Sequence, residues 1–264
     1  MASNSALITL TTDFGYDDPF VGIMKGVIFG INPQARVVDL SHGIPPQELK
    51  AAALVLKHSV PYFPQGTIHI AVVDPGVGSE RRPLLIESDG NYFVGPDNGV
   101  LSLALAGKEP SRIVELSKTT YHRRPISATF HGRDIFAPVA AHLSLGTPPT
   151  AFGATVDSFL RLSWPKAVKS ERGIEGEIVY IDRFGNLCTN IQEQDLTGLG
   201  TQNFSVALRD VVIQGLAPSY AAGESGHCVA LLNSWGLLEI ALYKGSAQRL
   251  TQAKMGDRVY IEAR

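Results

Sequence analysis

The fold of this chain is decided by the stretch Thr67-Ile68-His69-Ile70-Ala71-Val72-Val73-Asp74-Pro75-Gly76-Val77-Gly78-Ser79-Glu80-Arg81-Arg82. Its first seven residues are rich in β-branched types and precede a Pro-Gly break, which predicts a buried strand that leads into a tight loop. Asp74 is therefore expected at the carboxyl edge of a sheet, where open α/β sheets bind their ligands. A surface turn in which Asp74 caps the loop and pairs with an arginine explains the same residues. The stretch alone leaves both interpretations open.

Composition places the chain among ordinary globular proteins. It has 264 residues, a net charge of -2, 44% hydrophobic residues and 18% charged residues. The sequence has no basic stripe, so we expect no nucleic-acid partner. It has no basic leader segment and no run of about 20 apolar residues, which predicts no membrane association and a cytoplasmic location. Cys188 and Cys228 lack CxxC spacing and are interpreted as reduced, buried side chains, with a disulfide or a metal pair as alternatives.

The first part of the chain alternates between strands and helices. We predict strands at residues 6–12, 36–40, 67–73, 84–87, 92–94 and 112–116, and helices at 20–30, 48–59 and 100–106. A further apolar helix is expected to end at Gly146, with Pro138 in its first turn. The βαβαβ order at the start is typical of a parallel sheet. Residues 1–170 are therefore predicted to form an α/β domain with a mostly parallel sheet and flanking helices.

The pattern changes after residue 170. Short alternating runs separated by turn residues are found at 177–181, 186–190, 204–208, 211–213, 228–232, 237–241 and 258–261. No long helical pattern interrupts them. Residues 171–264 are therefore predicted to form a smaller antiparallel β-barrel or sandwich domain.

Several polar residues fall at strand ends or in loops, where binding and catalytic groups concentrate. Asp13 follows the first strand and could accept two sugar hydroxyls or simply cap the next helix. His131 precedes a helix and has either a catalytic or a structural role. The segments 182–186 and 233–236 have the form of hairpin turns, which is their simplest interpretation.

Other common chemistries are not supported by motifs. The chain lacks HExxH, a Walker A loop and GxSxG, and Gly76-x-Gly78 lacks the third glycine of a dinucleotide fingerprint. No pair of histidines or carboxylates has metal-ligand spacing. We therefore predict no metal, while a site assembled from distant residues stays open.

Taken together, the motifs resemble the adenosine-forming S-adenosylmethionine hydrolases, also called S-adenosylmethionine hydroxide adenosyltransferases, which are related to fluorinating and chlorinating enzymes. The resemblance runs from Ala6 almost to the C-terminus. It rests on Thr12-Asp13-Phe14-Gly15, Val38-Asp39-Leu40-Ser41-His42, Val73-Asp74-Pro75-Gly76-Val77-Gly78, Gly95-Pro96-Asp97-Asn98-Gly99, Thr129-Phe130-His131-Gly132-Arg133-Asp134, Phe184-Gly185-Asn186 and Asn233-Ser234-x-Gly236. Such a resemblance implies an α/β domain that carries the catalytic residues, a β domain that completes the pocket, and a homotrimer with active sites between subunits.

The resemblance also implies roles for individual residues. Asp74, Arg81 and His131 match the catalytic triad, which would present water to C5′ of the substrate. Which of Asp74 and His131 takes the proton is left open by the sequence. The substrate-binding residues are implied to be Asp13 for the ribose diol, Asp182 for the methionine ammonium, Asn186 and neighbouring Phe184 for the adenine side, Ser234 for the methionine end, and Glu239 and Ala241 on the strand beside the base.

Four positions depart from the halogenating relatives. Asp74 stands in place of their tyrosine and Gly132 in place of their halide-binding serine, while Gln47 replaces a tryptophan and Trp235 an arginine. The departures at Asp74 and Gly132 favour water over halide, whereas those at Gln47 and Trp235 leave the contacts at these two positions open. The sequence thus predicts hydrolysis of S-adenosyl-L-methionine to adenosine and L-methionine, with no cofactor. A binding protein without turnover, and a lyase or halogenase acting on the same substrate, remain the alternatives.

Overall fold

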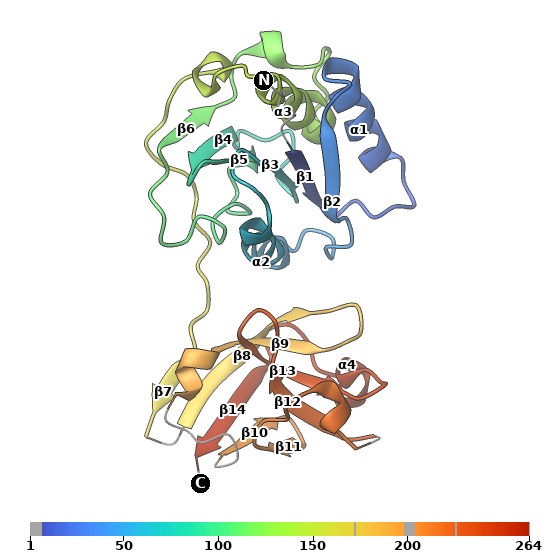
Figure 1. Ribbon diagram of the computed structural model, residues 1–264, viewed down its shortest axis with the longest axis vertical. Helices are drawn as coiled ribbons and strands as arrows, with labels where there is room; N and C mark the ends of the chain where they lie inside the picture. Colours follow the sequence, from blue (N-terminus) through green and yellow to red (C-terminus); the bar gives the residue numbers. More distant parts are fainter. Residues whose placement is uncertain (1–6, 172, 198–203, 225, 264) are drawn as a thin grey trace. The chain divides into compact units, whose positions relative to one another are not determined.

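The chain forms two compact units, Met1–Leu162 and Ser163–Arg264, called unit 1 and unit 2 below (Figure 1). The computed structural model describes residues 7–171, 173–197, 204–224 and 226–263. Within these residues no helix is long and apolar enough to cross a membrane.

Unit 1 is built on a six-stranded mixed sheet with the strand order β2-β1-β3-β5-β4-β6. Its strands are β1 (Leu7–Thr12), β2 (Arg36–Ser41), β3 (Ile68–Val72), β4 (Pro83–Ser88), β5 (Asn91–Pro96) and β6 (Arg112–Glu115). The pairs β1–β2, β1–β3 and β3–β5 are parallel, whereas β4 runs antiparallel to β5 and β6. The predicted parallel βαβαβ start is confirmed. β3 lies inside the sheet with every residue buried, as its apolar composition requires.

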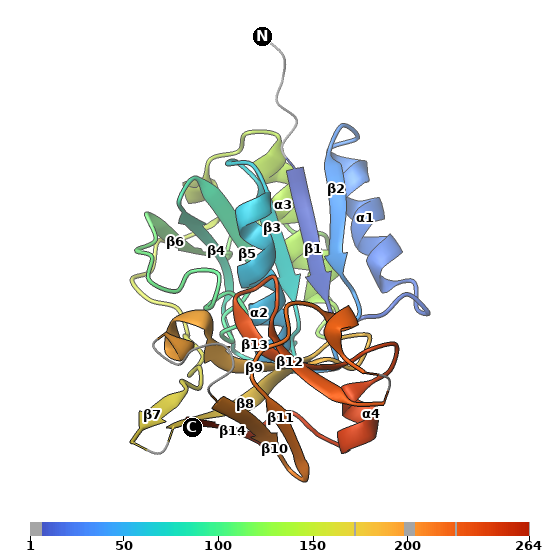
Figure 2. The same ribbon diagram turned by 60° about the horizontal axis from the view of Figure 1, so that its bottom comes forward.

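The helices of unit 1 lie on both faces of this sheet (Figure 2). They are α1 (Phe20–Ile31), α2 (Leu49–Ser59) and α3 (Ala137–Ser144), with short helical turns at Val60–Tyr62, Thr119–Tyr121, Gly132–Phe136 and Pro149–Phe152. α1 and α3 contact each other, and Met24 and Val139 join Ile8 and Leu10 in one buried cluster. α2 covers the opposite face. Pro138 occupies the first turn of α3, as predicted.

The helix predicted at residues 100–106 is wrong. The segment consists of successive turns with hydrogen bonds to the third residue back, such as Ser102 N to Gly99 O (2.9 Å) and Ala106 N to Leu103 O (3.3 Å). Its apolar side chains are buried almost all round, so they lack the one-sided pattern of a surface helix. Tertiary burial overrides helical propensity in this segment.

Unit 2 is an antiparallel sheet that curls toward a barrel. The strand order is β11-β10-β14-β8-β9-β13-β12, with β7 paired to β8. The strands are β7 (Val168–Ser170), β8 (Gly173–Ile181), β9 (Leu187–Gln192), β10 (Phe204–Leu208), β11 (Val211–Gln214), β12 (Cys228–Leu232), β13 (Leu237–Leu242) and β14 (Arg258–Ala263). The two ends of the order, β11 and β12, contact each other. The predicted antiparallel β domain is confirmed.

Sequence patterns missed several short elements of unit 2. β7, the helix α4 (Ala247–Thr251) and the helical turns Glu193–Leu196 and Tyr220–Ala222 are too short to show periodicity. Both cysteines are free, as expected, and Cys188 is buried. The predicted burial of Cys228 is wrong in degree, because this residue at the start of β12 is only half-buried.

His69 in β3 should make stability depend on pH. Its ring is buried, lies 2.8 Å through Nδ1 from Thr9 Oγ1, and stacks on Phe93. Burial, together with the charge of Lys108, lowers the pKa of His69 to about 4. Between pH ~6.5 and pH ~4 the unfolded chain therefore binds a proton that the native chain does not, so stability is complete above pH ~6.5 and falls on acidification.

We predict that His69→Asn flattens this pH dependence. The contribution of one such group is on the order of 3 kcal/mol across the interval. Urea unfolding at pH 7 and pH 4.5 measures it, with the exposed His227→Asn as the control that keeps the wild-type slope. An unchanged slope in His69→Asn would contradict the assignment.

Candidate active site

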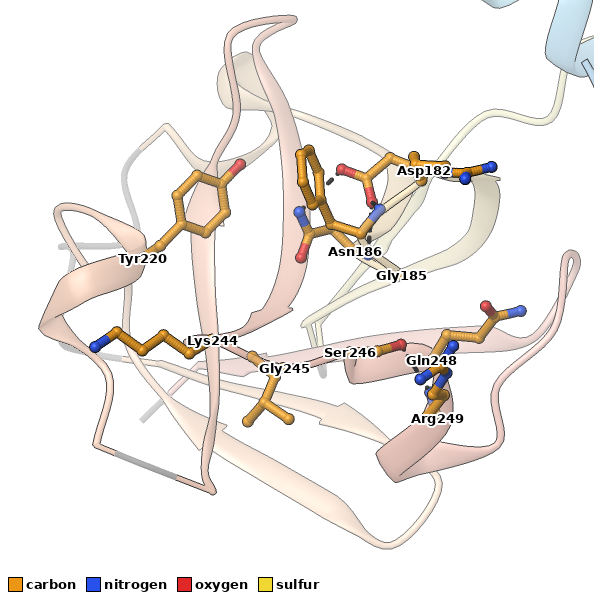
Figure 3. Close-up of a pocket in the computed structure, with 12 residues that line it drawn as sticks. Asp182, Gly185, Asn186, Tyr220, Lys244, Gly245, Ser246, Gln248 and Arg249 are labelled. Atoms are coloured by element: carbon orange, nitrogen blue, oxygen red, sulfur yellow. Dashed lines mark hydrogen bonds between the residues drawn. The ribbon is translucent and has the colours of Figure 1, made fainter. Parts of the chain in front are cut away.

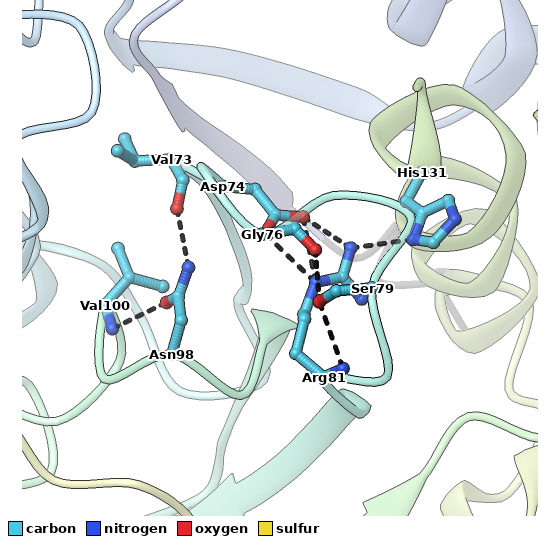
Figure 4. A network of polar contacts seen from close by, with 8 residues as sticks. All are labelled: Val73, Asp74, Gly76, Ser79, Arg81, Asn98, Val100 and His131. Carbon is cyan, nitrogen blue, oxygen red and sulfur yellow. Dashed lines mark hydrogen bonds and ion pairs between the residues drawn. The ribbon is translucent and has the colours of Figure 1, made fainter. Parts of the chain in front are cut away.

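The loop after β3 is fixed by its neighbour in the sheet. Val73 O accepts a hydrogen bond from Asn98 Nδ2 (2.8 Å), and Asn98 Oδ1 accepts one from Val100 N (3.1 Å), as Figure 4 shows. Asn98 follows β5, which pairs with β3. Asn98, after the end of β5, thus fixes the direction in which the chain leaves β3, immediately before Asp74.

Asp74 is held by the guanidinium of Arg81. Nε of Arg81 lies 3.0 Å from both carboxylate oxygens, and Nη2 makes a further contact with Oδ2. The side chains are only 5% (Asp74) and 9% (Arg81) exposed. The guanidinium carbon of Arg81 also lies 5.5 Å from the centre of the buried Phe136 ring, a cation–π arrangement. A low-dielectric surrounding strengthens this ion pair.

The turn between these partners needs glycine at position 78. Gly78 has φ +78°, and a Cβ there would come within 2.3 Å of Ala128 O. Ser79 N and Oγ both donate to Gly76 O, at 3.1 and 2.7 Å. Glycine at position 78 therefore lets this turn approach the backbone of residue 128.

His131 completes the group through Arg81. Nη2 of Arg81 lies 2.7 Å from His131 Nδ1 (Figure 4). Because a guanidinium only donates hydrogen bonds, Nδ1 is the acceptor, and the proton of the neutral ring is on Nε2. Burial and the charge of Arg81 lower the pKa of His131, against opposing effects of Asp74 and Asp134. The structure therefore brings the three predicted catalytic residues together around one cation and holds the imidazole neutral.

A second network supports Asp13. Its carboxylate accepts a hydrogen bond from Gln47 N (2.9 Å), and Gln47 has a positive φ of 67°. Next to it in sequence, Thr12 Oγ1 lies 2.8 Å from Nδ1 of the buried His42. His42 Nε2 is in turn 3.0 Å from Asp39 Oδ1. The contact between Thr12 and His42 thus joins the Thr12–Gly15 motif to the Val38–His42 motif.

Asp13, Asp74 and His131 line one cavity of about 480 Å³ in unit 1. Gln47 and Gly132, two of the departures from the halogenating relatives, line it as well. Three further lining residues, Phe14, Phe20 and Phe130, form a cluster of edge-to-face rings with centroids 5.3 to 5.9 Å apart. The cavity thus combines three carboxylates, those of Asp13, Asp18 and Asp74, with an imidazole and an aromatic wall. Sequence reasoning missed Phe20, whose only signal was its place in the apolar pattern of α1.

Unit 2 presents the predicted hairpin residues in a prearranged form. Asp182 Oδ1 accepts hydrogen bonds from Phe184 N (2.9 Å) and Asn186 N (2.8 Å), and Oδ2 accepts one from Asn186 Nδ2 (2.9 Å). Gly185 has φ +82°, and a Cβ there would lie 2.0 Å from Ser246 Oγ. The turn is therefore a hairpin, as its simplest interpretation held. It also leaves Phe184 76% exposed.

Two cavities adjoin this hairpin. The larger, about 740 Å³, is lined by Asp182, Phe184 and Asn186 together with Lys244, Gln248 and Arg249 from the region around α4 (Figure 3). The smaller, about 320 Å³, is lined among others by Asp182, Phe184, Ser234 and Glu239. Tyr220 lines both, and sequence reasoning missed it because it stands in a loop without a motif.

The remaining predicted residues occupy different settings. Trp235 lines the smaller cavity, with its ring 5.4 Å from that of Tyr180. Ala241 is fully buried in β13 against Val229 and Leu231, and the residues described as lining these cavities do not include it. Its implied place beside the base stays a prediction. Within the described residues, no group of three or more histidines, cysteines and carboxylates could hold a metal ion.

The Asp74 carboxylate and the half-buried His131 imidazole line one cavity and share the Arg81 guanidinium. The chain is an enzyme. It belongs to the S-adenosylmethionine hydroxide adenosyltransferase family. Residues 8–153 match the model of the N-terminal domain of that family, and residues 176–260 match that of its C-terminal domain.

Relatives of known name agree with this family. An (R)-S-adenosyl-L-methionine hydrolase of Thermus thermophilus is 39% identical over 95% of this chain and 97% of its own length. One of Salinispora arenicola is 37% identical over 97% of both chains. A fluorinase of Actinoplanes sp. is 28% identical over 91% of this chain and 92% of its own. A crystal structure of an uncharacterized conserved protein from Thermotoga maritima has a TM-score of 0.90 at 34% identity, covering 96% of this chain and 99% of that one.

The state of His131 can be measured directly. We predict that its imidazole is neutral with the proton on Nε2 near pH 7, and that Arg81→Gln raises its pKa, because the cation that opposes protonation is removed while Asp74 and Asp134 remain. Nitrogen-15 chemical shifts of the histidine rings, followed over pH, give both results. His142 is the control: burial alone lowers its pKa, so Arg81→Gln should leave it unchanged. A proton on Nδ1, or a pKa of His131 that does not rise, would contradict the network.

Proposed function

We propose that this enzyme hydrolyses S-adenosyl-L-methionine to adenosine and L-methionine by in-line attack of water at C5′. The observation that carries the proposal is the Asp74–Arg81–His131 group, in which Asp74 and His131 line a cavity that Asp13 also lines and Arg81 joins the two. The hydrolase relatives, similar over almost the whole chain, support the same reaction.

The departure of the leaving group in this reaction requires no general acid. The C5′–S bond breaks with its electron pair on sulfur, so methionine departs as a neutral thioether and needs no proton. A new C5′–O bond forms to water, which must lose one proton. The task of the protein is to orient water and to favour its hydroxide character. No cofactor enters this scheme.

Arg81 and Asp74 share that task in our proposal. Nη1 of Arg81 is buried and has no hydrogen-bond partner among the described residues, so the guanidinium keeps donor capacity beyond its bonds to Asp74 and His131. A fixed cation beside water favours the hydroxide form. Because Nδ1 of His131 is already an acceptor for Arg81, we assign proton acceptance to the Asp74 carboxylate and water orientation to His131 Nε2–H.

Substrate binding is assigned residue by residue. Asp13 accepts the ribose hydroxyls, since its cavity is shared with Asp74. Asn186 binds the adenine edge, and Phe184 offers an exposed ring for stacking. Asp182 binds the methionine ammonium through the carboxylate lone pairs that its hydrogen bonds within the hairpin leave free. Ser234 holds the methionine end, and Glu239 and Ala241 lie on the strand beside the base.

The assembly and the location of the enzyme are part of the proposal as well. A homotrimer with active sites between subunits and a cytoplasmic location both follow from the sequence considerations above. Asp74 and Gly132 in the places of the tyrosine and serine of the halogenating relatives favour water as nucleophile.

Asp74→Asn should separate binding from chemistry. The amide keeps the shape of the carboxylate but cannot accept the proton, so turnover should fall by about 10² to 10⁴, with little change in substrate affinity. Initial rates and calorimetric binding measure the two effects. Asp97→Asn is a matched control, because Asp97 also pairs with an arginine, Arg82, in unit 1 but does not line the cavity. Full turnover in Asp74→Asn would remove this residue from the mechanism.

Oxygen labelling distinguishes hydrolysis from its alternatives. In oxygen-18 water without halide, each adenosine formed should carry one solvent oxygen at its 5′-hydroxyl, and methionine should carry none. A lyase would release 5′-methylthioadenosine, a halogenase would need halide, and a binding protein would return the substrate unchanged. Mass spectra of the nucleoside decide among them, and unlabelled adenosine would refute water attack.

A further inference from the structure

Glu239 in β13 is a buried carboxylate surrounded by neutral donors. It is only 3% exposed. Its Oε1 accepts a hydrogen bond from Tyr220 OH (2.8 Å), and its Oε2 accepts from Asn233 Nδ2 (3.0 Å) and Cys188 Sγ (3.2 Å). Burial and the adjacent Glu239 carboxylate raise the pKa of both Tyr220 and Cys188, which keeps these donors protonated.

Within the described part of the chain, no lysine or arginine forms an ion pair with Glu239. Arg183, the cationic residue in the lining of the same cavity, is exposed. Burying a carboxylate without a cation costs free energy, which a cationic ligand would recover. A cationic ligand that enters this cavity can therefore pair with Glu239.

The cavity that Glu239 lines has the other features of a cation site. Asp182 contributes a second carboxylate, and the rings of Tyr180, Phe184, Tyr220 and Trp235 contribute to the wall. Aromatic faces attract organic cations, most strongly where water is excluded. Carboxylates and rings together suit an onium group better than a neutral one.

We infer that Glu239 selects the cationic substrate, so that this protein prefers the sulfonium S-adenosylmethionine over its neutral thioether counterpart S-adenosylhomocysteine. The inference rests on the proposed function and assigns Glu239 a role in discriminating charge, in place of contact with the base. Its effect is electrostatic and does not require a hydrogen bond to the ligand.

The same charge has a kinetic consequence. As the C5′–S bond breaks, the positive charge on sulfur declines, so Glu239 stabilises the bound substrate more than the transition state. Removing the charge of Glu239 should therefore raise KM without lowering kcat. A residue that only maintains the fold would not produce this split.

Glu239→Gln tests the inference with the network kept in place. The amide oxygen can accept from Asn233 and Cys188 while the amide nitrogen donates to the Tyr220 oxygen. Tyr220→Phe is the matched control, since it removes one hydrogen bond to Glu239 but keeps the charge. Calorimetry in the Asp74→Asn background, which preserves the substrate, gives the affinities for S-adenosylmethionine, S-adenosylhomocysteine and adenosine.

We expect Glu239→Gln to reduce the preference for sulfonium over thioether by at least about tenfold, with adenosine affinity unchanged and Tyr220→Phe keeping the wild-type preference. An unchanged preference overturns the inference, and an equal loss of adenosine affinity assigns Glu239 to the base instead. If Glu239→Gln does not fold, the unsubstituted protein still tests the inference. Equal affinity of that protein for S-adenosylmethionine and S-adenosylhomocysteine overturns it. Failure of the proposed function is a separate result, seen as absence of labelled adenosine from wild-type protein.

Discussion

The site depends on one cation that two partners share. Arg81 contacts both carboxylate oxygens of Asp74 and donates to His131 Nδ1, in a position closed off by Phe136. An arginine cannot lose its charge or accept a hydrogen bond, so the His131 nitrogen that faces it is an acceptor. The imidazole becomes a neutral Nε2–H donor, and the carboxylate keeps free lone pairs for a proton. A lysine would supply charge without this planar, two-sided geometry.

This arrangement stands on three segments that are far apart in sequence. The loop after β3 carries Asp74 and Arg81, Asn98 after β5 fixes the start of that loop, and His131 precedes the turn that continues into α3. Parallel pairing of β3 with β5 makes the first two segments neighbours. Ser79 and Asn98 bond to the backbone, and Arg81 bonds to Asp74 and His131, so these side chains are ordered without a ligand.

Unit 2 follows a different principle. Its hairpin satisfies the Asp182 carboxylate from its own backbone, and Glu239 is satisfied by three neutral donors. Among the described residues, neither carboxylate forms an ion pair, so both are held in place by neutral donors. A cavity lined by these two carboxylates favours cations. Binding a cation does not require the loss of side-chain conformational entropy at Asp182 and Glu239, because both side chains are already ordered without a ligand.

The sequence by itself determined the class of both units and the parallel strand–helix start, and the family resemblance of its motifs singled out Asp74, Arg81 and His131 as predicted catalytic residues. Local periodicity and ordered motifs record these features. It misplaced the turns at residues 100–106, because burial on all sides removes the periodic signal that distinguishes a helix. Only the tertiary structure decided that Arg81 joins Asp74 to His131, which nitrogen of His131 is the acceptor, and that Glu239 is buried without a cation among the described residues. These depend on distances between residues up to 51 positions apart, such as Cys188 and Glu239, which no local pattern encodes.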